Sequence, residues 1–335
     1  MSGLEVFLDD TPGETRGVVM RDGLAHHLII HRDDDEPRHR LGARVVGRVA
    51  RVEAAFGAAF VDMGCGEPFG FLPLSGGAPV REGDRVQVEV TAERRDGKGP
   101  ALRRLGAGEG DPRLISEGPG VVEILAELAP GVAPVEGAPA IEAVWAAEEE
   151  ALEVRHLFNS VGVDLALERT RALVAVDIDH AGQAGRDPKQ ARARANREGL
   201  RQAARLIRLK SWGGLVAIDL VGTRVNPEHA LTDVRAAFDQ PHAAYGPVSR
   251  FGLAQLSLPW RRQPIEARLR GGEAVAVARS LRQALLTRTQ APRLVARCAP
   301  DLAAAVGPLA ARLGPRAGTV VDPTFAAGRY EIKET

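Results

Sequence analysis

The sequence of 335 residues has few lysines, cysteines and aromatic residues. Four of its 44 basic residues are lysine, and its two cysteines, Cys65 and Cys298, stand far apart in the chain. Their separation excludes a CxxC metal site, and two isolated cysteines in a reducing compartment do not form a disulfide. We therefore expect both cysteines to be small packing residues.

Long apolar runs are also missing. No stretch approaches the roughly 18 residues that span a bilayer. The first residues, MSGLEVFLDDTPGETR, carry acidic side chains where a signal peptide carries basic ones, and they lack its apolar segment. With 44% hydrophobic and 26% charged residues, the chain has the composition of a globular protein with two or three modest cores. We expect a cytoplasmic protein without membrane association.

The formal net charge is zero, which by itself argues against a nucleic-acid partner. The charges are nevertheless segregated along the chain. Residues 114–154 include nine acidic residues and no basic one, whereas residues 186–210 include nine basic and two acidic residues. A basic stretch of this kind is typical of a surface that binds a polyanion.

The pattern of apolar residues divides the chain into several parts. Residues 1–36 read as two or three short strands, and residues 37–106 show dense β alternation punctuated by Gly and Pro, as in a small closed barrel. Residues 107–140 are rich in turn residues, which predicts a connector with little core. The following 140–158 have helical spacing, and we interpret their Glu148–Glu150 run as a solvated face.

A strand–helix–strand unit is the clearest element of the sequence. Residues 171–179 form an apolar run that ends in aspartate, residues 191–210 have helical spacing, and residues 213–222 form a second apolar run. This order predicts two parallel strands joined by a helix. From residue 263 onward, helical stretches alternate with short strands, as in a small α/β module.

Asp177 and Asp219 stand at the carboxyl ends of these two predicted strands. On neighbouring strands, about 4.8 Å apart, their carboxylates would repel each other unless a cation lay between them. Magnesium suits such a site because it takes one or two carboxylates, keeps several waters and can activate one of them for attack on a phosphate. Asp179 would lie on the same side and ligate or orient a water. The alternative, that these aspartates cap turns, stays open.

The predicted helix carries a stripe of arginines beside its apolar stripe of Leu200, Ala203, Ala204 and Ile207. The arginines recur at spacings of three and four residues: Arg194, Arg197, Arg201, Arg205 and Arg208. Residues at these spacings share one face of a helix. A row of arginines next to two carboxylates suits a polyanionic substrate.

Four of the nine phenylalanines fall in the predicted barrel: Phe56, Phe60, Phe69 and Phe71. Small barrels of this type bind single strands by stacking bases on aromatic rings. The alternative is that the rings fill the barrel core, and we favour it for Phe56 and Phe69.

Several strings resemble the ribonuclease E/G family. ARVVGRVARVEAAFGAAFVDMGCGEPFGFLPL and ERRDGKGPAL are similar to its S1-type OB domain. RALVAVDIDHAG, ANREGLRQAARLIRLKSWGGLVAIDLVG and SRFGLAQLS are similar to its DNase-I-like catalytic subdomain, and VVDPTFAAGRYEI to the end of its small domain. The similarity extends over about three quarters of the chain.

The resemblance implies an S1-type OB barrel inserted in an RNase-H-like piece, then a DNase-I-like α/β catalytic subdomain and a small C-terminal α/β module. The expected divisions are 1–36 and 141–170 for the RNase-H-like piece, 37–106 for the barrel, 107–140 for a shortened acidic connector, 171–262 for the catalytic subdomain and 263–335 for the small domain.

The resemblance also implies roles for single residues. Asp177 and Asp219 match the family's magnesium ligands, with manganese as a substitute, and Asp179 stands where the family usually has Asn. Phe60, Phe71 and Lys98 match residues that bind single strands. Arg208, Lys210 and Arg250 match basic positions near the scissile phosphate. The implied activity is an endoribonuclease that hydrolyses single-stranded RNA to 5′-phosphate and 3′-hydroxyl ends, in RNA processing or decay.

Two family features are missing. The RTAG-like motif of the 5′-monophosphate sensor is absent, and so is the CPxC zinc link. We therefore expect neither bound zinc nor a zinc-linked dimer. Two rival functions remain: an RNA-binding protein without cleavage, which Asp179 favours, and a protein-interaction module that docks through the acidic connector.

Overall fold

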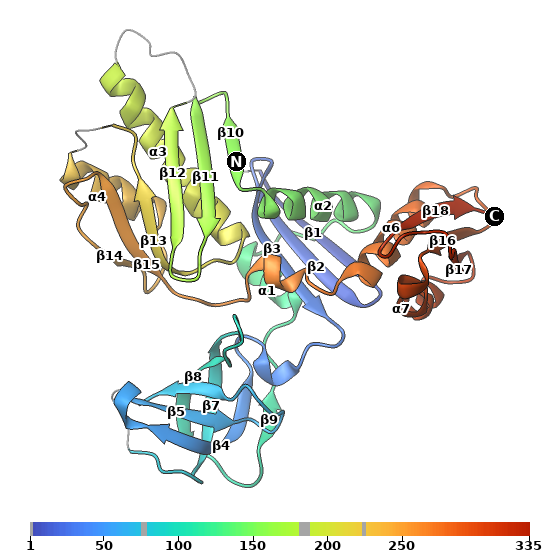
Figure 1. Ribbon diagram of the computed structural model, residues 1–335, viewed down its shortest axis with the longest axis horizontal. Helices are drawn as coiled ribbons and strands as arrows, with labels where there is room; N and C mark the ends of the chain where they lie inside the picture. Colours follow the sequence, from blue (N-terminus) through green and yellow to red (C-terminus); the bar gives the residue numbers. More distant parts are fainter. Residues whose placement is uncertain (1–2, 75–78, 181–187, 223–225) are drawn as a thin grey trace. The chain divides into compact units, whose positions relative to one another are not determined.

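A computed structural model describes residues 3–74, 79–180, 188–222 and 226–335. It contains two compact units (Figure 1). The first unit comprises Met1–Glu148 and Gln263–Thr335, and the second comprises Glu149–Arg262.

The chain begins with an antiparallel three-stranded sheet of β1 (Leu4–Thr11), β2 (Glu14–Arg21) and β3 (Leu24–Arg32), as predicted. Helix α1 (Val121–Leu128) packs its apolar side against this sheet, where Ile124 and Leu125 join the buried cluster. The expectation of a connector with little core is therefore wrong for this segment. The Gly and Pro residues on both sides of α1 indicated turns, and the short amphipathic helix between them was therefore not predicted.

Five strands then close into the predicted barrel. They are β4 (Arg44–Glu53), β5 (Ala58–Asp62), β6 (Gly70–Pro73), β7 (Arg85–Ala92) and β8 (Ala101–Ala107), with β9 (Arg113–Ser116) added beside β4. The ring order is β4-β5-β6-β8-β7 and back to β4, and the pairing of β6 with β8 is parallel whereas the others are antiparallel. A short 3-10 turn, η1 (Pro37–His39), precedes the barrel, and a second one, η2 (Ala54–Phe56), connects β4 to β5. This closed OB-like barrel confirms the expectation for residues 37–106.

The C-terminal part is the expected small α/β module. It contains α5 (Ile265–Arg268), α6 (Glu273–Thr287), β16 (Leu294–Cys298), α7 (Pro300–Arg312), β17 (Ala317–Val321) and β18 (Tyr330–Glu334). Buried Arg279 of α6 donates to Asp9 at 2.6 Å and to Glu14 at 2.8 Å, which ties the module to the first sheet. Cys298 lies in the module's core, and Cys65 packs against the barrel core, so both cysteines are packing residues as expected.

The second unit is a six-stranded sheet with two helices. Its strand order is β10 (Arg155–Phe158), β11 (Val163–Arg169), β12 (Val174–His180), β13 (Gly214–Asp219), β15 (Leu253–Leu258) and β14 (Ala244–Tyr245). Strands β12 and β13 are parallel and are joined through α3 (Pro188–Leu209), which confirms the strand–helix–strand prediction. Helix α4 (Pro227–Ala237) packs beside α3 (Figure 1).

The boundary that we expected at residue 170 is wrong. Helix α2 (Ala138–Leu152) ends earlier than its spacing suggested, and residues 155–169 form β10 and β11, which pair with one another and extend the sheet of β12. The change between units therefore falls near Glu148 and Glu149. Buried apolar side chains alternate with less buried ones along β11, so this strand extends the sheet of β12 rather than forming a separate subdomain.

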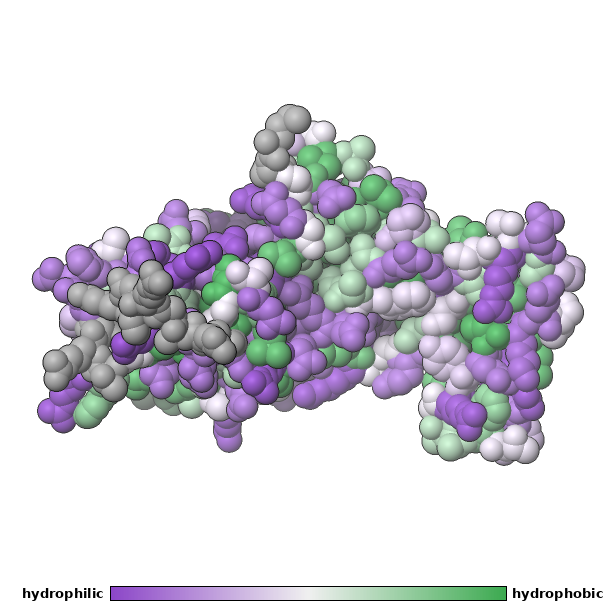
Figure 2. All heavy atoms as spheres, turned by 90° about the horizontal axis from the view of Figure 1, so that it is seen from above, coloured by the Kyte–Doolittle hydropathy of each residue, from purple (hydrophilic) through white to green (hydrophobic). Residues whose placement is uncertain are grey.

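The surface agrees with the globular composition. On the face shown in Figure 2, hydrophilic residues cover most of the surface and hydrophobic residues form scattered patches. In the part of the chain that the structure describes, no helix has the length and apolar character to cross a membrane.

Close packing between α3 and β12 fixes the helix over the sheet. Gly199 of α3 faces the buried Ile178 of β12, and a Cβ atom added at Gly199 would lie 2.4 Å from Cγ2 of Ile178. Real side chains do not approach so closely, so the absence of a side chain at 199 allows this helix–strand distance.

We predict that Gly199→Ala lowers the free energy of unfolding by about 1–3 kcal/mol, because the added methyl group overpacks the contact with Ile178. Chemical denaturation of the two proteins measures this difference. Ile178→Ala in the same chain makes room for the methyl group, so the double variant should be more stable than the sum of the single effects predicts. Strict additivity would contradict the contact.

Candidate active site

Asp177 and Asp219 lie opposite each other at the carboxyl ends of two parallel strands. They are direct Cα partners in the pairing of β12 with β13, as are Val176 and Ile218 one residue earlier. Both aspartates are exposed, whereas Val176 and Ile218 are buried. Because side chains alternate along a strand, the two carboxylates share the side of the sheet opposite to its packed apolar residues.

The carboxylates interact electrostatically. Partial burial raises the pKa of Asp177, and the negative charges of Asp219, Asp179 and Asp164 raise it further. Asp164 is the Cα partner of Asp179 on β11, but it pairs with Arg155 at 2.9 Å, and this contact lowers the pKa of Asp164. Of these three carboxylates, Asp219 raises the pKa of Asp177 most and Asp164 least.

This arrangement fits a divalent cation held by two carboxylates and waters. Among the described residues, no group of three or more His, Cys, Asp and Glu side chains is arranged to hold a metal ion. Asp179, expected to ligate the ion or to orient a water, accepts a hydrogen bond from the amide of His180 at 2.7 Å through one carboxylate oxygen. Magnesium keeps most of its waters when one or two protein carboxylates bind it, so the pair suits this ion.

Asn196 is a residue of this site that the sequence interpretation missed. Its side-chain amide donates to the carbonyl of Val221 at 3.1 Å, and its oxygen accepts from the Val221 amide at 2.8 Å. Asn196 thereby ties α3 to the backbone two residues beyond Asp219. A buried asparagine on the otherwise apolar side of the helix was the available signal.

The predicted arginine stripe is exposed along part of its length. Arg194, Arg197, Arg201 and Arg208 are exposed, and Arg201 pairs with Glu198 at 2.7 Å. The apolar stripe of Leu200, Ala203, Ala204 and Ile207 is buried as expected.

Arg205 and Lys210 must be removed from the predicted RNA-binding set. Arg205 is 3% exposed and donates to Glu150 at 2.7 Å, and Lys210 is 1% exposed and donates to the carbonyls of Ala151 and Glu153. The last residues of α2 and Glu153, which follows it, accept hydrogen bonds from these two buried cations. Glu150 forms an ion pair with Arg205, so it is not part of the solvated face that we expected for Glu148–Glu150.

Two further arginines lie near the carboxylate pair. Arg192, which we had not selected, is exposed on α3, and its Cδ is 3.4 Å from the Cβ position of Gly222, three residues beyond Asp219. Arg250, which we had selected, is exposed in the turn before β15. The first residue of β15, Leu253, is the Cα partner of Asp219. Both arginines therefore come from segments that border the carboxylate edge of the sheet.

The barrel presents aromatic side chains on its outer surface. Phe60 and Phe71 are Cα partners with ring centroids 6.0 Å apart, and Arg51 lies over the Phe60 ring at 4.6 Å. Phe71 is 36% exposed, and Lys98 is exposed in the loop before β8. Phe56 is 76% exposed, so the interpretation as a core residue is wrong for it, because η2 turns its ring away from the barrel interior. Phe69 is half-buried beside β6.

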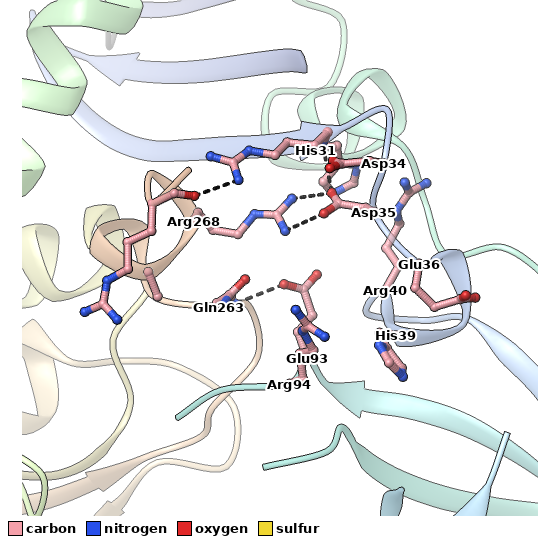
Figure 3. Close-up of a pocket in the computed structure, with 13 residues that line it drawn as sticks. His31, Asp34, Asp35, Glu36, His39, Arg40, Glu93, Arg94, Gln263 and Arg268 are labelled. Carbon is pink, nitrogen blue, oxygen red and sulfur yellow. Dashed lines mark hydrogen bonds and ion pairs between the residues drawn. The ribbon is translucent and has the colours of Figure 1, made fainter. Parts of the chain in front are cut away.

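The first unit also contains a polar cavity of about 310 Å³ (Figure 3). It lies among the end of β3, η1, the end of β7 and residues 263–270. Arg268 pairs with Asp35, and Glu93 accepts from the Gln263 amide at 2.9 Å. These contacts join segments of the unit, and none of the predicted site residues lines the cavity. We therefore assign it no part in the chemistry.

Comparison with known proteins identifies the region that holds the carboxylates. Residues 141–260 match the model of the Ribonuclease E/G family. The match contains Asp177, Asp219, α3 and the turn with Arg250, and confirms the family resemblance. No curated protein matches the chain.

We predict that Asp177→Asn raises the melting temperature in chelator at about pH 7. The folded-state pKa of Asp177 is raised, so its ionised form destabilises the fold above that pKa, and the penalty disappears as the pH falls through it. The gain should therefore shrink in acid. Melting curves across pH measure this, and Asp164→Asn is the control. Because its pKa is lowered, losing that carboxylate should decrease stability at neutral pH. A destabilising Asp177→Asn would contradict the assigned repulsion.

Proposed function

Because residues 141–260 belong to the ribonuclease E/G family, we propose that this protein is a magnesium-dependent endoribonuclease. Its substrate is single-stranded RNA, and its products carry 5′-phosphate and 3′-hydroxyl ends. The observation that carries the proposal is the register of β12 and β13, which sets Asp177 opposite Asp219. We further propose that the second unit corresponds to the DNase-I-like subdomain and the first sheet to part of the RNase-H-like piece.

In this proposal Asp177 and Asp219 hold the ion. When bound, magnesium supplies a cation that neutralises charge on the scissile phosphate and an activated water for in-line attack. Two ionised carboxylates are required, and the raised pKa of Asp177 means that acid weakens the site by protonating that group. Asn196 is a positioning residue, since it holds the backbone beyond Asp219 and touches neither carboxylate.

The exposed cations of α3 and of the turn before β15 receive the RNA backbone. Arg194 and Arg197 are exposed on α3, and Arg192 and Arg250 border the carboxylate edge. Arg208 is exposed in the last turn of α3, toward the start of β13 and away from Asp219. Guanidinium groups bind phosphate oxygens in a bidentate way, so they orient the strand as well as attract it. On the barrel, Phe60 and Phe71 stack bases and Lys98 contacts the strand.

The principal rival is a protein that binds RNA without cutting it. Asp179, which stands where the family usually has Asn, is the residue that favours this rival. One oxygen of its carboxylate accepts a hydrogen bond from the His180 amide. A cleavage assay separates the two functions directly.

We predict that the protein cuts a labelled single-stranded RNA in magnesium and not in chelator. Asp177→Asn and Asp219→Asn should each abolish cutting, because each removes a charged ligand. RNA binding, measured by fluorescence anisotropy, should change little, since the arginines and the barrel remain. Asp164→Asn is a matched control because its carboxylate is held by Arg155. If the parent protein binds RNA but never cuts it in magnesium or manganese, the rival is correct.

We predict that Phe71→Ala weakens binding of single-stranded RNA by about 1–3 kcal/mol, the usual contribution of one base–aromatic stack. Its ring is 36% exposed, so the melting temperature should stay close to that of the parent. Phe71→Trp should restore affinity. Leu72→Ala is the contrasting variant, because Leu72 is buried in the barrel core and its loss should lower stability first. A lower melting temperature without any loss of affinity in Phe71→Ala would make the ring a packing residue.

A further inference from the structure

The turn before β15 places one aromatic side chain at the carboxylate edge. β15 runs antiparallel to β13, so its first residue, Leu253, is paired with Asp219 at the last position of β13. Phe251 stands two residues before Leu253. Gly252 lies between them, and a Cβ atom built on it would be 4.0 Å from the carbonyl oxygen of Gly222, just beyond Asp219. Phe251 therefore belongs to a turn that borders the proposed metal site.

Hydrogen bonds hold this turn in one conformation. The Ser249 hydroxyl accepts from the Phe251 amide at 3.3 Å and from the Leu253 amide at 3.2 Å. The Ser249 amide donates to the Leu253 carbonyl, and the Gly252 amide donates to the Ser249 carbonyl. The position of Phe251 is thus set by four bonds around Ser249, which reduces the ordering that a ligand would have to impose.

The ring of Phe251 is 74% exposed although it is fully apolar. The guanidinium of Arg250 lies over it, 4.7 Å from the ring centroid. A flat apolar ring of this exposure, bordered by a cation, matches the chemistry of a nucleobase and its adjoining phosphate. Leu215 at the start of β13 is also exposed and apolar, but it lies at the opposite end of that strand from Asp219.

We propose that Phe251 is a base-stacking platform beside the scissile phosphate. One nucleobase of a single-stranded RNA stacks on the ring face that Arg250 leaves open, and the Arg250 guanidinium contacts the adjoining phosphate. The platform gives the second unit its own contact with a base, separate from Phe60 and Phe71 of the barrel. Stacking accepts every base, so the platform positions the strand without reading its sequence. This inference rests on the proposed function for the identity of the ligand.

Binding experiments test the platform without relying on cleavage. In a chain that carries Asp177→Asn, Phe251→Ala should weaken the binding of a short single-stranded RNA about tenfold. Phe251→Trp should bind like the parent, whereas Phe251→Leu should bind like the alanine variant, because leucine is apolar but cannot stack. Leu215→Ala, which removes another exposed apolar side chain of the same unit, should leave affinity unchanged.

A second measurement identifies the stacked base. An RNA with one abasic nucleotide, moved stepwise along the strand, should at one position lose as much affinity for the parent as Phe251→Ala loses for the intact strand. Combining that RNA with Phe251→Ala should cause little further loss. Equal affinities of the parent and Phe251→Ala, or full affinity in Phe251→Leu, would overturn the proposal. Failure of the parent to cut RNA in magnesium would instead refute the proposed function. The binding affinities are measured without cleavage, so they decide the platform separately.

Discussion

The parallel register of β12 and β13 is the constraint on which the candidate site depends. Side chains alternate along a strand, so a slip of one residue would send Asp177 or Asp219 to the packed side of the sheet. The buried residues Val176, Ile178 and Ile218 prevent such a slip, because they would become exposed at the same time. The hydrophobic core of the second unit therefore sets the distance between the two carboxylates.

Helix α3 connects this core to the surface that the proposed function assigns to the substrate. Gly199 allows α3 to approach β12, and the side chain of Asn196 binds the backbone of Val221 beyond β13. The helix is therefore held to both strands. Toward the end of α3, Arg205 and Lys210 are buried and donate to Glu150 and Ala151 in the last turn of α2. The basic residues of one helix are thus divided. Some satisfy internal acceptors, and the proposed function assigns others, which are exposed, to a phosphate backbone.

The elements with long apolar runs could be predicted from the sequence. The segments that pack against each of their faces could not. The strand–helix–strand unit and the barrel strands follow from periodicity, and so does the meeting of Asp177 with Asp219. Helical spacing placed Arg205 in the stripe correctly, but it contains no information about which segment covers that side. The same limit explains Phe56, whose exposure depends on a short turn. Phe251 was unremarkable until the register of β15 set it beside Asp219.

The positive and negative charges of the chain are equal in number but unevenly distributed in the structure. Buried pairs such as Arg279 with Asp9, and Arg205 with Glu150, neutralise charge inside each unit, whereas the carboxylate edge keeps a local excess of negative charge. A cation at that edge would remove the repulsion and allow a phosphate to approach the carboxylates. Asp179 adds to this excess, since its charge helps to raise the pKa of Asp177. In the proposed function, an aspartate at this position increases the attraction for a cation, because affinity rises with the charge of the surrounding carboxylates. It also makes the approach of RNA depend more strongly on that cation, since a phosphate would otherwise meet three carboxylates.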